Sequence, residues 1–343
     1  MKKGITTKPF GNFENKAVAA YTICNEGGMQ VTVINYGAAI TQIITPDKEG
    51  IPGNVILGFN SLEGYVQNGH QYHGCAIGRY CNRIAHSEFM LAGETYRLTG
   101  NNKNFSLHGG LKGFDKVWWS IEEQDDGCSL KLTYLSRDGE EGYPGNLNIE
   151  LIYTLTSNNE LILDYSAHTD KPTPVNLTNH CYFNLSAGKE ATILNHELKI
   201  YAIQFTEANE HLVPTGQLAF LENTPLDFSN NKTVGKDIKL AGGYDHNMIL
   251  NNNDGKAAEL FDPMSGRFME MITTEPAVQF YSGNALHCDN ETNNTKSSFI
   301  QHAGICLEAQ HYPNSPNEPS FPNTILRPGE KYRQTTSYKF SVR

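Results

Sequence analysis

The sequence lacks any long apolar run and several motifs that define large classes of protein. No apolar segment in its 343 residues is long enough to cross a bilayer, which excludes a membrane-spanning helix. Residues 1–9 carry positive charge without a following apolar segment, so we expect no signal peptide. There is no GxGxxG or Walker loop, no HExxH and no GxSxG elbow. These absences predict a site without cofactor or metal, working through protons and hydrogen bonds.

Basic residues are in deficit, and the cysteines are scattered. The chain has 27 Lys and Arg against 37 Asp and Glu, a formal net charge of −10, which argues against nucleic acid and membrane partners. The 7 cysteines are odd in number and form neither a disulfide framework nor a CxxC zinc motif. We therefore expect a cytoplasmic protein with reduced thiols, either a monomer or a homodimer.

Alternation with a period of two residues dominates the chain, while helical periodicity is scarce. Apolar residues alternate with polar ones over 147–155 and again over 161–167, with a short Asn-rich turn at 157–159 between them. Two such runs across a short turn predict a β-hairpin. The same pattern predicts strands at 130–134 and 31–36.

The pattern continues to the end of the chain. Residues 338–342 predict a last strand that closes the sheet, and the polar stretch 287–298 predicts an exposed loop. No linker or break in composition divides the sequence, and 31 Gly with 15 Pro supply turns. The fold class is therefore all-β, a large antiparallel β-sandwich, and we expect one domain over 1–343.

One carboxylate, Glu308, stands inside an apolar run of strand type that precedes a proline-rich loop. Burying an unpaired carboxylate is costly and raises its pKa, which is how a general base is tuned. The alternative is that Glu308 lies on the solvent face of a half-buried strand, and this segment alone favours that alternative.

Two histidines stand in segments that otherwise look structural. His108 precedes two glycines that would let the backbone approach a ligand closely, or it caps a tight turn. His180 is flanked by strand-forming residues and amide side chains, and an imidazole suits acid catalysis near neutral pH. A core histidine with satisfied hydrogen bonds is the alternative for His180.

Three further segments offer hydrogen-bonding groups. Asn82 and Arg83 follow Arg79 in GRYCNRI and present donors that suit sugar hydroxyls or a carboxylate, or else surface salt bridges. Asp245 lies in a polar turn and could hold a hydroxyl, although Asp is also an ordinary turn residue. Gln279 stands in a β-rich run.

Taken in order, these segments resemble the aldose 1-epimerase (galactose mutarotase) family. Each block is weak alone, but their ordered co-occurrence over nearly the whole chain is specific. The matching blocks are INYGAAITQIITPDKEG, NVILGF, GRYCNRI, NFSLHGGLKGFDKVWW, PTPVNLTNHCYFNL, YDHN, EPAVQFYSGNAL and GICLEAQHYPNSPNEPSFPNTILRPGEKYRQTTSYKF. Cys81 and Cys181 depart from the family, standing where alanine or serine is more usual.

The resemblance implies a reaction and a set of roles. Glu308 matches the base that takes the proton of the anomeric hydroxyl, His180 the acid that protonates the ring oxygen, and His108 the second histidine of the sugar site. The ligand-holding positions are Asn82, Arg83, Asp245, Gln279 and Tyr182. The reaction interconverts α and β anomers of free hexoses such as galactose and glucose through the open aldehyde.

Two expectations about the acid–base pair follow from this chemistry. Glu308 and His180 would be held apart across the sugar ring. Activity at neutral pH would need the pKa of His180 to be raised, which a nearby carboxylate would favour. The competing functions are a sugar-binding or sensor protein without turnover, and a hexose-6-phosphate 1-epimerase, which would need a cluster of basic residues.

Overall fold

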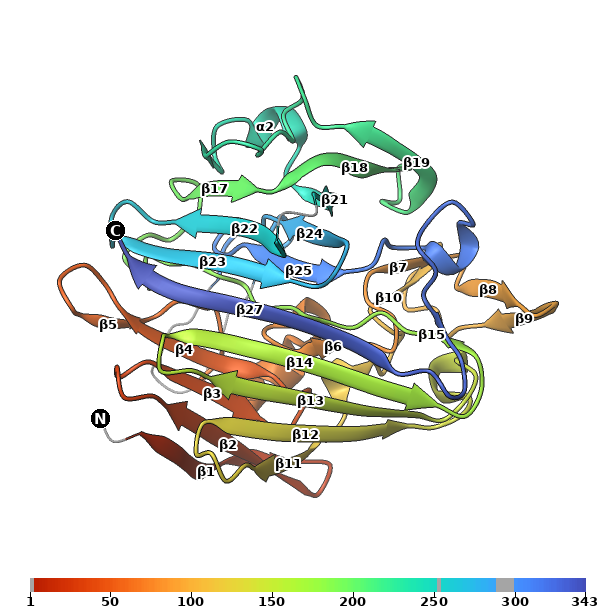
Figure 1. Cartoon of the computed structure of the whole chain (residues 1–343), viewed down its shortest axis with the longest axis horizontal. Helices are drawn as coiled ribbons and strands as arrows, with labels where there is room; N and C mark the ends of the chain where they lie inside the picture. The colour runs from red at the N-terminus through yellow and green to blue at the C-terminus, as the bar shows by residue number, and fades with distance from the viewer. Residues whose placement is uncertain (1–2, 252–253, 288–298) are drawn as a thin grey trace.

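The computed structural model describes residues 3–251, 254–287 and 299–343, and it is built almost entirely of strands (Figure 1). The loop predicted at 287–298 lies, apart from its first residue, outside the described residues. Two short α-helices occur in the described part, α1 (Leu62–Gln67) and α2 (Ile238–Ala241). None of the helices described is both long and apolar enough to cross a membrane.

Three larger antiparallel sheets carry the fold. The first has the order β1 (Gly4–Phe13), β2 (Lys16–Cys24), β3 (Gln30–Ile34), β4 (Ile40–Pro46), β5 (Pro52–Asn54). The second has nine strands in the order β11 (Ser120–Glu123), β12 (Ser129–Ser136), β13 (Leu147–Leu155), β14 (Glu160–Thr169), β27 (Tyr332–Val342), β23 (Arg267–Thr273), β22 (Lys256–Phe261), β17 (Glu197–Ile200), β20 (Lys232–Thr233). The third has the order β19 (Pro214–Phe220), β18 (Ala202–Ala208), β21 (Asp245–Leu250), β24 (Ala277–Tyr281), β25 (Cys306–Gln310).

Short strand pairs and single 3₁₀ turns complete the described structure. The pairs are β6 (Ala76–Ile77) with β16 (Thr178–Asn179), β7 (Arg83–Ala85) with β10 (Phe105–Leu107), β8 (Glu88–Leu91) with β9 (Glu94–Arg97), and β15 (Thr173–Pro174) with β26 (Ile325–Leu326). The 3₁₀ turns are η1 (Gly69–Gln71), η2 (Phe114–Lys116), η3 (Glu140–Gly142) and η4 (Ser315–Asn317).

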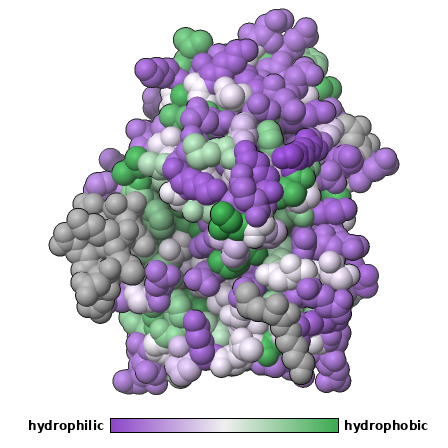
Figure 2. Space-filling view, turned by 90° about the vertical axis from the view of Figure 1, so that its left-hand side faces the viewer, coloured by the Kyte–Doolittle hydropathy of each residue, from purple (hydrophilic) through white to green (hydrophobic). Residues whose placement is uncertain are grey.

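The nine-stranded sheet forms one layer of a sandwich, and the two five-stranded sheets pack against it. A single apolar cluster contains Val31 of β3, Leu132 of β12, Leu151 of β13, Phe280 of β24 and Leu307 of β25, so the core lies between the layers. The face in Figure 2 is hydrophilic over most of its visible area, with hydrophobic residues in smaller patches. The predicted antiparallel β-sandwich is confirmed.

The predicted hairpin is confirmed, with the expected face inward. Leu147, Ile149, Leu151, Tyr153 and Leu155 of β13 are all buried. Their alternation therefore marks the face that packs on the core, because successive side chains of a strand point to opposite faces.

The last predicted strand is confirmed, and it joins the sheet at an interior position. β27 lies inside the nine-stranded sheet, paired with β14 on one side and β23 on the other (Figure 1). Its alternation correctly predicts Tyr338 and Phe340 as buried, but Val342 is 48% exposed. The alternation of a strand shows which of its faces is buried, but it does not show which strands pair with it. The position of β27 in the sheet therefore could not be predicted from its sequence.

Candidate active site

Every residue proposed from the sequence as catalytic or ligand-holding lines one cavity of about 390 Å³. This volume is in the range of small-molecule sites. The eight residues are Asn82, Arg83, His108, His180, Tyr182, Asp245, Gln279 and Glu308. They come from segments spread over more than 200 positions of the sequence, and the fold brings them to one place.

Three neighbouring strands supply Asp245, Gln279 and Glu308 to the cavity. Glu308 of β25 pairs directly with Gln279 of β24, which in turn pairs with Asn247 of β21. Residues opposite one another in an antiparallel pair share a face, and Asp245 lies on that face two residues before Asn247. Asp245 begins β21, so its prediction as part of a polar turn is wrong.

Asn82 and His108 fix each other at the end of the β7–β10 pair. The Asn82 N–H donates to Nδ1 of His108 (3.2 Å), and the His108 N–H donates to the Asn82 carbonyl oxygen (3.0 Å). Both residues have positive φ, 61° for Asn82 and 52° for His108. Non-glycine residues persist there only when their surroundings hold them, and such positions concentrate at functional sites.

The glycine after His108 serves the protein backbone and not a ligand. A Cβ at Gly109 would lie 2.0 Å from the carbonyl oxygen of Gly78, and its φ is +90°. The expectation that this glycine admits a ligand is therefore wrong. Its close packing holds His108 against the segment that leads to Asn82.

Arg79, the first arginine of GRYCNRI, is not among the residues that line the cavity. Its guanidinium is buried and donates to Ser136 Oγ (2.6 Å), the carbonyl oxygen of Pro144 (2.8 Å) and Thr173 Oγ1 (3.2 Å). Arg79 thus anchors the segment that carries Asn82, and only the second arginine of the motif reaches the site.

His180 follows β16, and its main chain is held by the segment before β6. The His180 N–H donates to the Cys75 carbonyl oxygen (3.0 Å), and the His180 carbonyl oxygen accepts from the Gly74 N–H (2.9 Å). Its ring packs 4.9 Å from that of Tyr182 and 5.3 Å from that of His108, measured between centroids. Nε2 of His180 lies 3.7 Å from Oε1 of Glu308.

Glu308 is buried, so the alternative of a solvent-facing glutamate is excluded. Burial raises the pKa of its carboxyl group well above the usual value, the charge of Asp245 raises it further, and Arg83 opposes both. Among the described residues Oε2 of Glu308 has no hydrogen-bond partner. A buried carboxyl group with a raised pKa and a free oxygen has, in its ionised form, a high affinity for a ligand's proton.

Burial acts on the two histidines in the opposite direction. It lowers the pKa of His180 to about 4, and it lowers that of His108 well below the usual value, with the charge of His180 next in importance. The expected rise in the pKa of His180 is therefore wrong. The cavity removes water from the ring, and the resulting cost of charging the ring exceeds the opposing effects of a main-chain hydrogen bond and of the charge of Asp245.

Arg83, Asp245 and Gln279 form a connected polar row. Nη2 of Arg83 lies 3.2 Å from Oδ2 of Asp245, and Nε2 of Gln279 donates to Oδ1 of Asp245 (2.6 Å). Oε1 of Gln279 and Nε of Arg83 are buried without a partner in the described structure. The row is thus fixed in place while keeping hydrogen-bonding capacity free.

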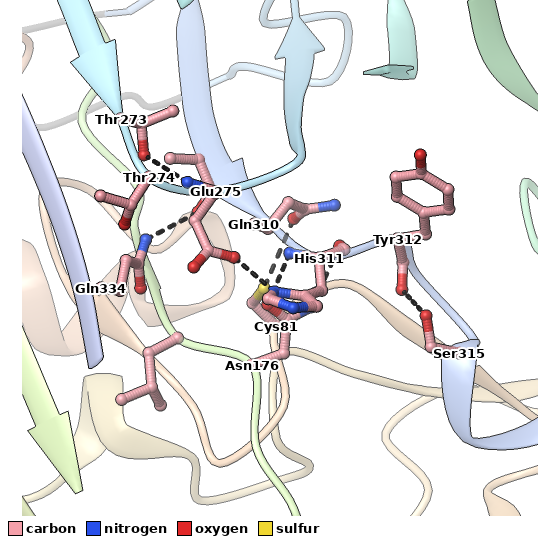
Figure 3. A network of polar contacts seen from close by, with 12 residues as sticks. Cys81, Asn176, Thr273, Thr274, Glu275, Gln310, His311, Tyr312, Ser315 and Gln334 are labelled. Carbon is pink, nitrogen blue, oxygen red and sulfur yellow. Dashed lines mark hydrogen bonds and ion pairs between the residues drawn. The ribbon is translucent and has the colours of Figure 1, made fainter. Parts of the chain in front are cut away.

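A second polar network connects β25 to the segment before Asn82 (Figure 3). Gln310 accepts from Sγ of Cys81 (3.4 Å). Its amide nitrogen donates to Oδ1 of Asn247 (3.1 Å). Asn176 holds His311 at both main-chain groups: its Oδ1 accepts from the N–H (3.0 Å), and its Nδ2 donates to the carbonyl oxygen (3.2 Å). These contacts tie the end of the strand that bears the carboxylate to the ligand-holding segment.

Several residues that line the cavity were not predicted from the sequence. They include Tyr72, Tyr281, Leu286 and Leu212. Tyr72 has a φ of 58°, and its ring lies 4.6 Å from that of His108. Tyrosine and leucine are common in every β-protein, so only the tertiary structure marks these copies as part of a site.

Within the described part of the chain, two clusters have the spacing of metal ligands, and the hydrogen bonds of their histidines argue against both. One is His108 with His180 and Glu308, and the other is Glu190 with His196 and Asp262. Nδ1 of His108 accepts the Asn82 N–H, and Nε2 of His196 accepts the Leu185 N–H (2.9 Å). In a neutral imidazole the other nitrogen then carries the proton and has no lone pair for a metal.

The geometry is that of an acid–base site for a small polar ligand, and the chain belongs to the aldose 1-epimerase family. The family model described as aldose 1-epimerase matches residues 19–339. The resemblance inferred from the motifs is therefore confirmed.

Individual relatives cover almost the full chain. Galactose mutarotase from Bos taurus is 42% identical over 318 residues, which cover 92% of each chain. Aldose 1-epimerase from Escherichia coli K12 is 37% identical over 330 residues, 93% of this chain and 94% of that one. The crystal structure of galactose 1-epimerase from Lactobacillus acidophilus NCFM is 30% identical, with a TM-score of 0.86 and coverage of 99% of both chains.

Proposed function

We propose that this protein is an aldose 1-epimerase, an isomerase that interconverts the α and β anomers of a free hexose such as galactose or glucose. The observation that carries the proposal is the pair formed by Glu308 and His180, 3.7 Å apart in a cavity lined mainly by polar and aromatic residues. Family membership supports the same reaction.

The short separation of the pair suits the chemistry better than the expected placement across the ring. The anomeric hydroxyl oxygen and the ring oxygen are bonded to the same carbon. A base for the first and an acid for the second must therefore lie close together. The expectation that Glu308 and His180 are held apart across the ring is wrong for this reason.

Ring opening moves one proton onto the carboxylate and one off the imidazole. Ionised Glu308 removes the proton of the anomeric hydroxyl, the C1–O5 bond breaks as the carbonyl forms, and protonated His180 gives its Nε2 proton to O5. The products are the open aldehyde, a protonated Glu308 and a neutral His180. These are the protonation states that burial favours, because the pKa of Glu308 is raised and that of His180 is lowered.

The order of the two pKa values therefore stabilises the open-chain intermediate inside the site. In the free enzyme the pair holds its single proton mainly on Glu308, and the form with the proton on His180 is the minor one. After rotation about C1–C2 exposes the other carbonyl face, Glu308 returns its proton to the carbonyl oxygen and His180 accepts the O5 proton. The ring closes as the other anomer.

The remaining cavity residues fix the sugar. Gln279 and Arg83 offer unpartnered atoms, and Asp245 orients both. His108 accepts at Nδ1, so its Nε2–H is a donor for a sugar oxygen. We assign Asn82 and Tyr182 to the same role from their places in the lining. Holding the sugar in the reactive orientation lowers the entropic part of the activation barrier and so raises the rate.

We further propose that residues 1–343 form one domain, acting in the cytoplasm as a monomer or homodimer. The six cysteines within the described residues are free thiols, which suits a reducing compartment. Analytical ultracentrifugation tests the oligomeric state.

The competing functions find less support in the site. A sugar phosphate would need several cations, yet Arg83 is the single Arg or Lys among the described residues that line the cavity, and it is paired with Asp245. A sensor without turnover has no use for a buried carboxylate beside an imidazole.

Polarimetry on freshly dissolved α-D-glucose and α-D-galactose tests the proposal. We expect the protein to accelerate the approach to anomeric equilibrium, with the Glu308→Gln variant as the matched inactive control. Binding of either sugar by calorimetry without acceleration would favour the sensor. Acceleration confined to hexose 6-phosphates would favour the phosphate branch.

A further inference from the structure

The acid–base role of His180 requires its two ring nitrogens to behave differently. Nε2 faces Glu308 and must gain and lose a proton in every turnover. Nδ1 must then keep its proton throughout, or the neutral ring would present an N–H to Glu308 when it should present a lone pair. In many enzymes a carboxylate or carbonyl oxygen holds the Nδ1 proton in this way.

In this structure the described partner of Nδ1 is a sulfur atom. Sγ of Cys306 lies 3.5 Å from Nδ1 of His180, and both groups are buried. Cys306 packs in a small apolar cluster with Tyr182, Leu286 and Ala303, which fixes its side chain.

The strand that bears the base also bears this sulfur. Cys306 and Glu308 are two residues apart on β25 and therefore lie on the same face. One side of the His180 ring system thus meets Cys306 and the other meets Glu308. Gln310, the next residue on that face, holds Cys81 beside the ligand-holding segment (Figure 3).

We propose that Cys306 is a positioning residue that accepts the Nδ1–H of His180 and so fixes the neutral tautomer whose Nε2 lone pair faces Glu308. The inference rests on the proposed function, and it adds how the acid is oriented. A thiol is a weak, uncharged acceptor. It orients the ring without the charge that an aspartate would bring, and the ring keeps the low proton affinity at Nε2 on which ring opening depends.

The electrostatics of the site agree with an uncharged sulfur. Burial raises the pKa of the Cys306 thiol well above its usual value, and the charge of Glu308 raises it further. The group therefore stays a thiol at neutral pH. A thiolate would instead raise the pKa of His180, which lies at about 4.

The direct test is ¹⁵N NMR of histidine-labelled protein, with the His180 signals assigned by their loss in His180→Asn. We expect wild type to show His180 protonated at Nδ1 at neutral pH. Cys306→Ser offers a hydroxyl oxygen as acceptor and should keep that tautomer and most of the wild-type kcat. Cys306→Ala should populate the Nε2–H tautomer and lower kcat about threefold to tenfold at unchanged KM, the worth of one lost hydrogen bond.

Cys181→Ala is the matched control, because Cys181 is buried next to His180 in sequence but belongs to the main core. It should lower stability without changing the tautomer. If Cys306→Ala does not fold, the wild-type spectrum still decides, since a wild-type ring protonated at Nε2 overturns the proposal. An unchanged tautomer in Cys306→Ala overturns it as well. Wild type with the expected tautomer but no mutarotation would refute the proposed function alone.

Discussion

Glu308→Gln should remove activity and stabilise the fold in the same variant. The amide copies the shape of a protonated carboxyl group but cannot accept the anomeric proton, so kcat should fall by about 10²–10⁴-fold, or about 2.7–5.4 kcal/mol of barrier. The stability effect has the opposite sign because burial raises the pKa of Glu308 well above 4.5. An acid that resists ionising in the folded state weakens that state whenever the unfolded chain ionises.

The pH window of the stability effect follows from the same shift. Below about pH 4.5, the usual pKa of the group, both folded and unfolded chains are protonated, and wild type and Glu308→Gln should be equally stable. As the pH rises toward the folded pKa, wild type loses about 1.4 kcal/mol per pH unit relative to the variant. Above the folded pKa the difference is constant. Urea unfolding from pH 4.5 to 8.5 measures it.

Glu275→Gln is the matched control, a buried glutamate that has a partner. Its Oε2 contacts Nδ1 of His311 at 2.5 Å. Burial alone would lower the pKa of His311, but the hydrogen bond and charge of Glu275 outweigh it and raise that pKa. The variant should lose about 1.5–3 kcal/mol of stability. This difference in stability between wild type and Glu275→Gln should have its full size below pH 6.5. It should shrink as the pH rises through the folded pKa of His311.

Equal effects of the two substitutions would contradict this reasoning. The reasoning predicts that Glu308, as a buried base that has no charged partner of its own among the described residues, destabilises the folded state, whereas Glu275 stabilises it through His311. If Glu308→Gln were less stable than wild type at pH 8, or if the difference did not depend on pH, the carboxyl group would not be the strained base that burial implies.

The kcat/KM profile of wild type should be a bell, with its acid limb near 4, set by His180, and its alkaline limb at the raised pKa of Glu308. Limbs at the ordinary values of 4.5 and 6.5 would contradict the assignment. Arg83→Ala and Asp245→Asn should mainly raise KM for galactose and glucose, because they break the row that holds the sugar, and an unchanged KM in both variants would exclude that role. Dialysis against EDTA should leave mutarotation unchanged, and loss of activity restored by a divalent ion would refute a purely proton-based site.

The strands and the site residues were predictable for different reasons. Alternation identified β13 and β14 because each strand packs one face on the core. The apolar residues of that face recur at every second position of the sequence. Glu308 and His180 were found through a motif resemblance, while their own segments favoured ordinary structural roles. Nothing local states that these two side chains meet.

What the sequence could not supply depends on tertiary surroundings. The low pKa of His180 results from burial by segments distant in sequence, including those that carry Tyr72 and His108. The contact of Cys306 with Nδ1 joins residues 126 positions apart. The role of Gly109 depends on the backbone of Gly78, which packs where a side chain would stand. Such features depend on the tertiary structure and not on the residues adjacent in sequence.

The interior place of β27 has a consequence for how the chain is made. β27 joins β14 to β23, so the two halves of the largest sheet cannot pair until β27 has left the ribosome. Thr335 and Asp164, which hydrogen-bond across that junction, are 171 positions apart. Pairings this distant slow folding and leave strand edges open meanwhile. We expect nascent chains that end before β27 to depend on chaperones, and chains that include β27 to gain protease resistance in one step.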